Sequence, residues 1–83
     1  MPDDLDFDSP VPLYEQLAAL LRRGIESGRF TGRMPSEPDL VQTYGVSRGT
    51  AHRAVGILRE AGYVQSSPGK GTFVVPRVKR SRN

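Results

Sequence analysis

The sequence contains no cysteine, no tryptophan and only one histidine, His52. The absence of cysteine excludes a disulfide framework and a thiolate metal site, and a single histidine cannot build a histidine cluster. The sequence also shows no nucleophile paired with a general base. We therefore expect no catalytic residues, no bound metal ion and no cofactor, and packing alone must stabilise the fold.

Long apolar runs are absent as well, since no segment approaches the roughly 20 apolar residues that cross a membrane. The acidic start of the chain lacks the basic region that opens a signal peptide. We therefore expect a cytoplasmic protein without a membrane partner. A chain of 83 residues supports one small core, which leaves no room for a second lobe that binds a small-molecule effector.

Charge is distributed unevenly along the chain. Lysine and arginine number 12 against nine acidic residues, for a net charge of +3. Four of the acidic residues lie before position 9, so residues 9–83 carry all 12 basic side chains and only 5 acidic ones. This balance suits a polyanionic partner such as a nucleic acid, although a basic surface also serves solubility alone.

The N-terminal part divides into an acidic segment and a helix. Residues 1–9 combine four aspartates with few apolar residues, which predicts a flexible acidic N-terminus. From Pro12 onward apolar residues recur at helical spacing, which predicts an amphipathic helix that ends near Gly28. The apolar positions of this helix are Leu13, Leu17, Leu20, Leu21 and Ile25.

Two further helices are predicted over about residues 36–61. Ser36 should cap the shorter one, which stops at Gly45, and Ser47 should cap the longer one, which stops at Gly62. Val46 lies between them and should pack into the core. The apolar positions of the longer helix are Ala51, Ala54, Val55, Leu58 and Ala61.

The C-terminal part predicts a β-hairpin. Residues 63–66 and 72–75 are β-rich runs, and residues 67–71 between them are turn formers. Arg33 and Met34 are candidates for a brief additional strand, and residues 77–83 form a basic tail or the start of an interdomain linker. The predicted fold class is therefore α+β, with three helices followed by a two-stranded hairpin.

A helix that can enter a groove, followed by a basic loop that can reach a neighbouring groove, is an arrangement typical of DNA-binding proteins. Helix N-termini at capping serines also attract phosphate. Glycines in the hairpin tip allow close approach of the backbone. The predicted DNA-contacting residues are Ser36, Ser47, Arg48, Gly49, Thr50, His52, Arg53, Gly69, Lys70, Gly71 and Thr72, with Arg33 as a further candidate.

These residues also have ordinary structural explanations. Arg48 and Arg53 fit a solvated helix face, the serines are explained equally well by capping alone, and Lys70 suits an ordinary turn. His52 could donate to a guanine or a phosphate, or could be a bystander. Gly49 on an exposed helix face costs about 1 kcal/mol relative to alanine, and we expect it to let the helix backbone approach DNA closely.

Four short motifs follow one another between residues 35 and 74. They are Pro35, Ser36 and Glu37; then Val46, Ser47 and Arg48 with Thr50 and Ala54; then Ala61, Gly62, Tyr63 and Val64; then Gly69, Lys70, Gly71, Thr72, Phe73 and Val74. In this order and spacing they resemble the N-terminal winged helix-turn-helix of GntR-family bacterial transcription regulators. Residues 12–17 are similar to the HutC-like and YtrA-like branches of that family.

The resemblance implies a winged helix-turn-helix over residues 10–76, with the hairpin over residues 63–75 as its wing. It implies that the recognition helix, residues 47–61, lies in the major groove and the wing tip, residues 67–72, at the minor groove. It further implies a homodimeric repressor or activator on a palindromic operator in the bacterial nucleoid, and of these two we expect a repressor. A C-terminal effector or dimerisation domain is also implied, and the isolated domain is expected to be monomeric.

Two positions depart from the family pattern. The family usually places a DNA-contacting arginine where this chain has Pro38, and a second arginine of the recognition helix where it has His52. Arg48 keeps the pattern. We therefore expect an operator that differs from the common half-site of the family, with Arg53 or Arg33 partly compensating for the missing arginines.

Sequence-specific binding of double-stranded DNA for transcriptional control is the function that these features predict. A winged helix that serves as a protein-interaction or assembly module is the alternative, because one fold supports several functions. An enzyme is the least supported reading, since the glycine-rich tip lacks the strand-to-helix context of a phosphate-binding loop.

Overall fold

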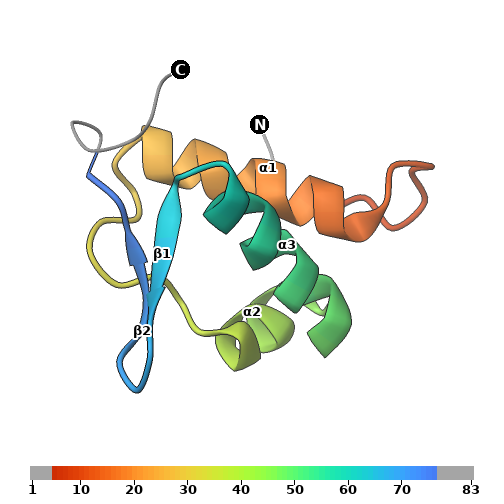
Figure 1. The fold of residues 1–83 in the computed structure, drawn as a ribbon. Coiled ribbons are helices and arrows are strands. Elements are labelled where there is room, and N and C mark those ends of the chain that lie inside the picture. Colours follow the sequence, from red (N-terminus) through yellow and green to blue (C-terminus); the bar gives the residue numbers. More distant parts are fainter. Residues whose placement is uncertain (1–4, 77–83) are drawn as a thin grey trace.

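The computed structural model describes residues 5–76. Its elements are α1 (Leu13–Glu26), α2 (Glu37–Tyr44), α3 (Arg48–Glu60), β1 (Val64–Ser67) and β2 (Gly71–Val74). Three helices followed by one hairpin confirm the predicted α+β winged helix-turn-helix (Figure 1). The basic tail predicted over residues 77–83 lies outside the described residues, as does the beginning of the acidic segment.

Local capping signals define the helix-turn-helix. Ser36 accepts a hydrogen bond from the Asp39 backbone N–H, and the Asp39 carboxylate accepts one from the Ser36 N–H, which completes a capping box. Gly45 ends α2 at φ 70°, a left-handed conformation that favours glycine. Ser47 then caps α3 through the N–H of Thr50. Both predicted serine caps and the predicted stop at Gly45 are therefore present in the structure.

The core lies where α1 packs against α3 and where α3 packs against α2. Its largest fully buried side chains are Leu17 and Leu21 of α1, Leu40 of α2 and Leu58 of α3. Val46, in the turn between α2 and α3, is buried as predicted. Burying one leucine side chain contributes about 1.5–3 kcal/mol, so these contacts hold α3 firmly against the other two helices.

Ala61, which was counted among the apolar positions of the longer helix, is not buried with the others. The residue is exposed, because α3 ends at Glu60 and Ala61 lines a groove between α1 and α3. Leu13, predicted on the apolar side of α1, is only half-buried at the first position of its helix. Both residues lie at helix ends, where the neighbouring helix covers less of the surface.

The wing is an antiparallel hairpin in which Val64 pairs with Val74 and Ser67 pairs with Gly71. Its strands are displaced by one residue from the predicted ranges, and residues 68–70 form the turn. The predicted brief strand is confirmed as an isolated bridge between Arg33 and Phe73. This bridge ties the segment before α2 to β2 and so fixes the wing relative to the helices.

Residues 5–9 contact α1 through the side chain of Gln16. Its amide oxygen accepts from the N–H of Asp6 at 2.8 Å, and its amide nitrogen donates to the carbonyls of Asp6 and Val11 at 3.0 and 2.8 Å. Leu5 packs against the core. The prediction of a flexible N-terminus did not include these contacts. They depend on one glutamine side chain, which has no recognisable pattern in the sequence.

No helix within residues 5–76 is both long and apolar enough to cross a membrane.

Candidate nucleic-acid interface

Three segments that carry predicted DNA contacts lie along one side of the molecule. In Figure 1 the wing loop, α2 and the start of α3 all occupy the lower part of the view. The bridge at Arg33 holds the wing there, and the short turn around Gly45 places α2 next to α3. The fold therefore brings the predicted residues of the helix-turn-helix and the wing to a common side.

The first turn of α3 presents polar groups to solvent. Ser47 Oγ accepts from the Thr50 N–H at 3.0 Å and donates to Thr50 Oγ1 at the same distance. Arg48 and Gly49 are exposed beside this cap, whereas Thr50 is half-buried. The partial positive charge of a helix N-terminus and the Arg48 guanidinium are thus adjacent, which suits an anionic partner.

Glycine at position 49 is not required by the protein itself. A Cβ built at Gly49 would have the Oγ of Ser47 as its nearest neighbour, at 3.9 Å. A Cβ at Gly56 would meet nothing within 4 Å. Both positions therefore forgo about 1 kcal/mol of helix propensity without any benefit to the packing of this chain.

His52 does not stand alone on the recognition helix. Its Nδ1 lies 3.0 Å from Oε2 of Glu37, the first residue of α2. Both side chains remain accessible, with 69% of His52 and 38% of Glu37 exposed. An ionised carboxylate only accepts hydrogen bonds, so Nδ1 carries the hydrogen and Nε2 is the ring nitrogen left for a partner.

Arg53 is positioned by an aromatic ring from another helix. Its guanidinium carbon lies 3.9 Å from the centroid of the Tyr14 ring, at the start of α1. Stacking of a guanidinium on an aromatic face is favourable and restricts the long arginine side chain. Arg53 is exposed as predicted, and the contact with Tyr14 holds it at the edge of the recognition helix.

The Arg33 side chain contacts the backbone of the wing loop. Its Nη2 donates to the carbonyl of Lys70, and a Cβ built at Gly71 would lie 3.2 Å from its Nε. Lys70 and Gly69 are exposed in the loop, and Thr72 is half-buried in β2. The guanidinium of Arg33 is thus engaged in shaping the loop tip around Lys70.

Pro38, where the resemblance would place a DNA-contacting arginine, has no side-chain hydrogen-bond donor. It lines a shallow hollow together with Val41, Gln42 and Arg48.

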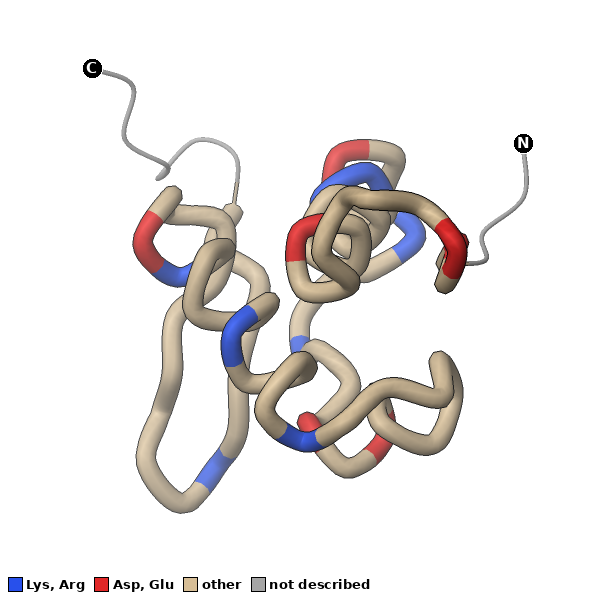
Figure 2. The backbone as a smooth tube through the Cα atoms, turned by 90° about the vertical axis from the view of Figure 1, so that its right-hand side faces the viewer, with Lys and Arg blue, Asp and Glu red and all other residues tan. Residues whose placement is uncertain are grey.

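Among the described residues, no group of three or more His, Cys, Asp or Glu side chains is placed so that it could hold a metal ion. Figure 2 shows basic positions spread over the wing and the helices, with acidic positions among them. The proposed DNA-binding side is therefore not a continuous positively charged surface, and contacts of individual side chains must define the interface.

Sequence reasoning missed Glu37 and Tyr14 as members of this region. Glu37 entered only as part of the first of the four motifs, and Tyr14 only within the similarity of residues 12–17. Neither has a sequence signal that points to α3, because both contacts depend on how the helices pack.

The chain matches the family model described as bacterial regulatory proteins, gntR family, over residues 13–74. The chain belongs to the GntR family. This match confirms the resemblance predicted from the four sequence motifs.

Several GntR-type regulators are similar to this chain. It is 40% identical over 79 residues to the uncharacterized HTH-type transcriptional regulator YurK of Bacillus subtilis (strain 168), covering 92% of this chain and 33% of that protein. It is 40% identical over 68 residues to the histidine utilization repressor of Klebsiella aerogenes, covering 80% and 28%. The chain thus spans about a third or less of the length of these curated relatives.

Solved structures also resemble this GntR domain. The AraR(DBD) in complex with operator ORX1 superposes with a TM-score of 0.77 at 33% identity, covering 87% of this chain and 98% of that one. YtrA from Sulfolobus acidocaldarius, a GntR-family transcription factor, gives a TM-score of 0.81 at 24% identity, covering 89% and 80%. The likeness to YtrA shows the shared fold.

Proposed function

We propose that this chain is the DNA-binding domain of a transcription regulator and that it binds one double-stranded operator in preference to other DNA. The observation that carries the proposal is the exposed N-terminal part of α3, where Arg48, Gly49 and His52 are open to solvent on the same side of the molecule as the wing loop (Figure 1). The similar AraR(DBD), which was solved in complex with operator ORX1, supports operator binding by this domain.

In this proposal α3 enters the major groove and the wing tip reaches the minor groove. Arg48 can donate two hydrogen bonds to the O6 and N7 of a guanine, the contact most often used for specific readout. The backbone carbonyl of Lys70 accepts a hydrogen bond from Arg33, which fixes the backbone of the wing loop at this residue. In this proposal the Lys70 side chain approaches phosphates or the floor of the minor groove. Ser36 and Ser47 present helix N-termini to the DNA backbone.

The regulator as a whole is proposed to act as a homodimeric repressor on a palindromic operator, at the nucleoid of a bacterial cytoplasm. The similarity to the histidine utilization repressor supports repression. Since the curated relatives are about three times as long as this chain, effector binding is assigned to parts of the longer proteins that this chain does not match.

Selection of bound duplexes from a random DNA library tests the proposal. We expect the parent chain to select a defined half-site that contains a guanine. The Arg48→Ala variant should lose the preference for that guanine. A palindrome of two half-sites would support binding as a dimer. A pool without any enriched sequence would overturn the proposal and would favour the alternative, a protein-interaction winged helix.

A further inference from the structure

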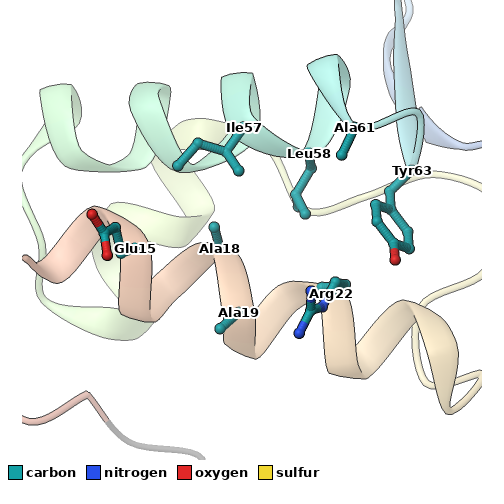
Figure 3. A pocket seen from close by; sticks show the side chains of 8 residues that line it. All are labelled: Glu15, Ala18, Ala19, Arg22, Ile57, Leu58, Ala61 and Tyr63. Carbon is teal, nitrogen blue, oxygen red and sulfur yellow. The ribbon is translucent and has the colours of Figure 1, made fainter. Parts of the chain in front are cut away.

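A groove separates α1 from α3 and includes none of the proposed DNA contacts (Figure 3). Its volume is about 210 Å³. Ile57 projects into it and is 39% exposed, a large apolar side chain left open to solvent. Covering such a side chain is favourable. The groove is lined by Glu15, Ala18, Ala19, Arg22, Ile57, Leu58, Ala61 and Tyr63.

The α1 wall of this groove carries opposite charges at its two ends. Glu15, Ala18, Ala19 and Arg22 follow the spacing that places residues on one helix face. Figure 3 shows Glu15 and Arg22 toward opposite ends, with the two alanines between them. Within residues 5–76, neither charged side chain has an ion-pair partner. Two charges without an ion-pair partner thus flank the half-buried Ala19, and the exposed Ile57 lies across the groove.

The order of these charges fits a second copy of the same chain. The midpoint between residues 15 and 22 falls between Ala18 and Ala19, so a twofold axis through this point would set two α1 helices antiparallel. Each Glu15 would then face the Arg22 of the other copy. A twofold contact requires a patch that is complementary to itself. The small side chain of Ala19, half-buried next to the axis, allows the two helices to approach closely, and Ala18 beside it is buried in the core.

We propose that the α1–α3 groove is a self-association surface on which two copies pair through antiparallel α1 helices and reciprocal contacts of Glu15 with Arg22. Exposed ion pairs contribute register and orientation more than affinity. The groove has fewer lining residues than the roughly 20–30 on each side of a stable interface. The pairing is therefore weak in dilute solution and forms where copies are held at high local concentration.

Charge exchange tests the reciprocal contact without DNA, so its outcome is independent of the proposed function. Sedimentation equilibrium of the 83-residue chain at millimolar concentration should show a monomer–dimer equilibrium. Glu15→Arg and Arg22→Glu should each raise the dimer dissociation constant about fivefold or more, and the double variant should restore it, because the two charges act as a pair. Glu60→Arg and Arg23→Glu make the same charge changes elsewhere and should leave the constant unchanged.

Two results would overturn the proposal. One is a parent chain that stays monomeric over the whole concentration range, and the other is a double variant as weak as the single variants. Circular dichroism of each variant identifies any that fails to fold, and the result for the double variant does not depend on the stability of either single one.

Cysteine crosslinking provides a second test, because the natural chain has no cysteine. Ala19→Cys lies next to the proposed axis, where the two Cα atoms should come within the range of about 4.4–6.8 Å that a disulfide needs. Oxidation should give a disulfide dimer faster than for Gln42→Cys, an exposed position on α2. Adding Glu15→Arg should slow the reaction. Equal rates for the two cysteine positions would contradict the proposal.

Discussion

His52 of α3 and Glu37 of α2 are joined by a contact of 3.0 Å between Nδ1 and Oε2. The contact links the recognition helix to the helix that precedes it, on the side where DNA is proposed to bind. A carboxylate near DNA phosphates is repelled, so Glu37 weakens binding unless it has another role. Orienting the imidazole, with Nε2 turned outward, is a role that the geometry supports.

Glu37→Ala and His52→Ala should therefore alter preference at the same base positions. We expect His52→Ala to lower affinity for the selected operator about tenfold, the scale of one specific base contact. The double variant should lose less than the two single losses combined, because the residues act together. Competition with duplexes that carry single base changes measures both effects. Glu60→Ala, at the far end of α3, is the matched control, and additive losses at different base positions would argue against a joint role.

Gly49→Ala should separate stability from DNA binding. The new methyl group meets no atom closer than 3.9 Å, so the variant should gain up to about 1 kcal/mol in the free energy of unfolding. It should also bind the operator several-fold more weakly, because the methyl group holds the helix away from the DNA. Gly56→Ala should gain similar stability and keep its affinity. Urea denaturation and duplex titration measure the two quantities, and unchanged or tighter binding by Gly49→Ala would disprove the close approach.

The stacking of Arg53 on Tyr14 should matter for both affinity and stability. Tyr14→Leu removes the aromatic face and should cost about 0.5–1 kcal/mol of stability. It should also weaken operator binding, because Arg53 is then free to adopt many conformations. Tyr14→Phe keeps an aromatic face and serves as the control.

Arg53→Ala tests whether Arg53 compensates for the arginines that Pro38 and His52 replace. If this variant binds the selected operator as tightly as the parent, Arg53 does not compensate for them.

Gly71→Ala should disturb the wing from within. Gly71 has φ 125°, which side chains other than glycine rarely adopt, and a Cβ there would lie 3.2 Å from Arg33 Nε. We expect a loss of about 1–3 kcal/mol in unfolding free energy. In the double variant Gly71→Ala with Arg33→Ala, the close contact of the new Cβ with Arg33 is removed but the strain of the φ angle remains. The double variant should therefore recover only part of the lost stability. Thermal denaturation measures the loss, and a Gly71→Ala variant as stable as the parent would show that the loop relaxes freely.

Local signals in the sequence predicted the helices well. Ser36, Gly45 and Ser47 act within their own turns, so capping and the left-handed stop are visible in the sequence alone. The strands were displaced by one residue, because the register of the hairpin depends on its turn and on the distant bridge at Arg33. Ala61 was grouped with the apolar positions of its helix although it is exposed, because periodicity cannot show where the helix and its partner end.

The exposure of the candidate DNA-contacting residues was predictable from the sequence, whereas the contacts that support them were missed. Arg48, Gly49 and Lys70 are exposed on one side of the fold, as their motifs predict. The partners Glu37 and Tyr14 were missed, because their contacts arise from helix packing and lie 15 and 39 positions away from His52 and Arg53 in the chain. Side-chain pairs of this kind require the three-dimensional arrangement.

The salt dependence of binding to the selected operator and to a scrambled duplex tests the central claim most directly. Phosphate neutralisation makes the logarithm of affinity fall with the logarithm of salt concentration, with a slope near −0.9 per phosphate contacted. Between about 50 and 200 mM salt, we predict that both duplexes lose affinity steeply, that the operator remains the tighter ligand throughout, and that Lys70→Ala makes the slope shallower by about one. Equal affinity for the two duplexes, or a flat response to salt, would contradict sequence-specific DNA binding by this domain.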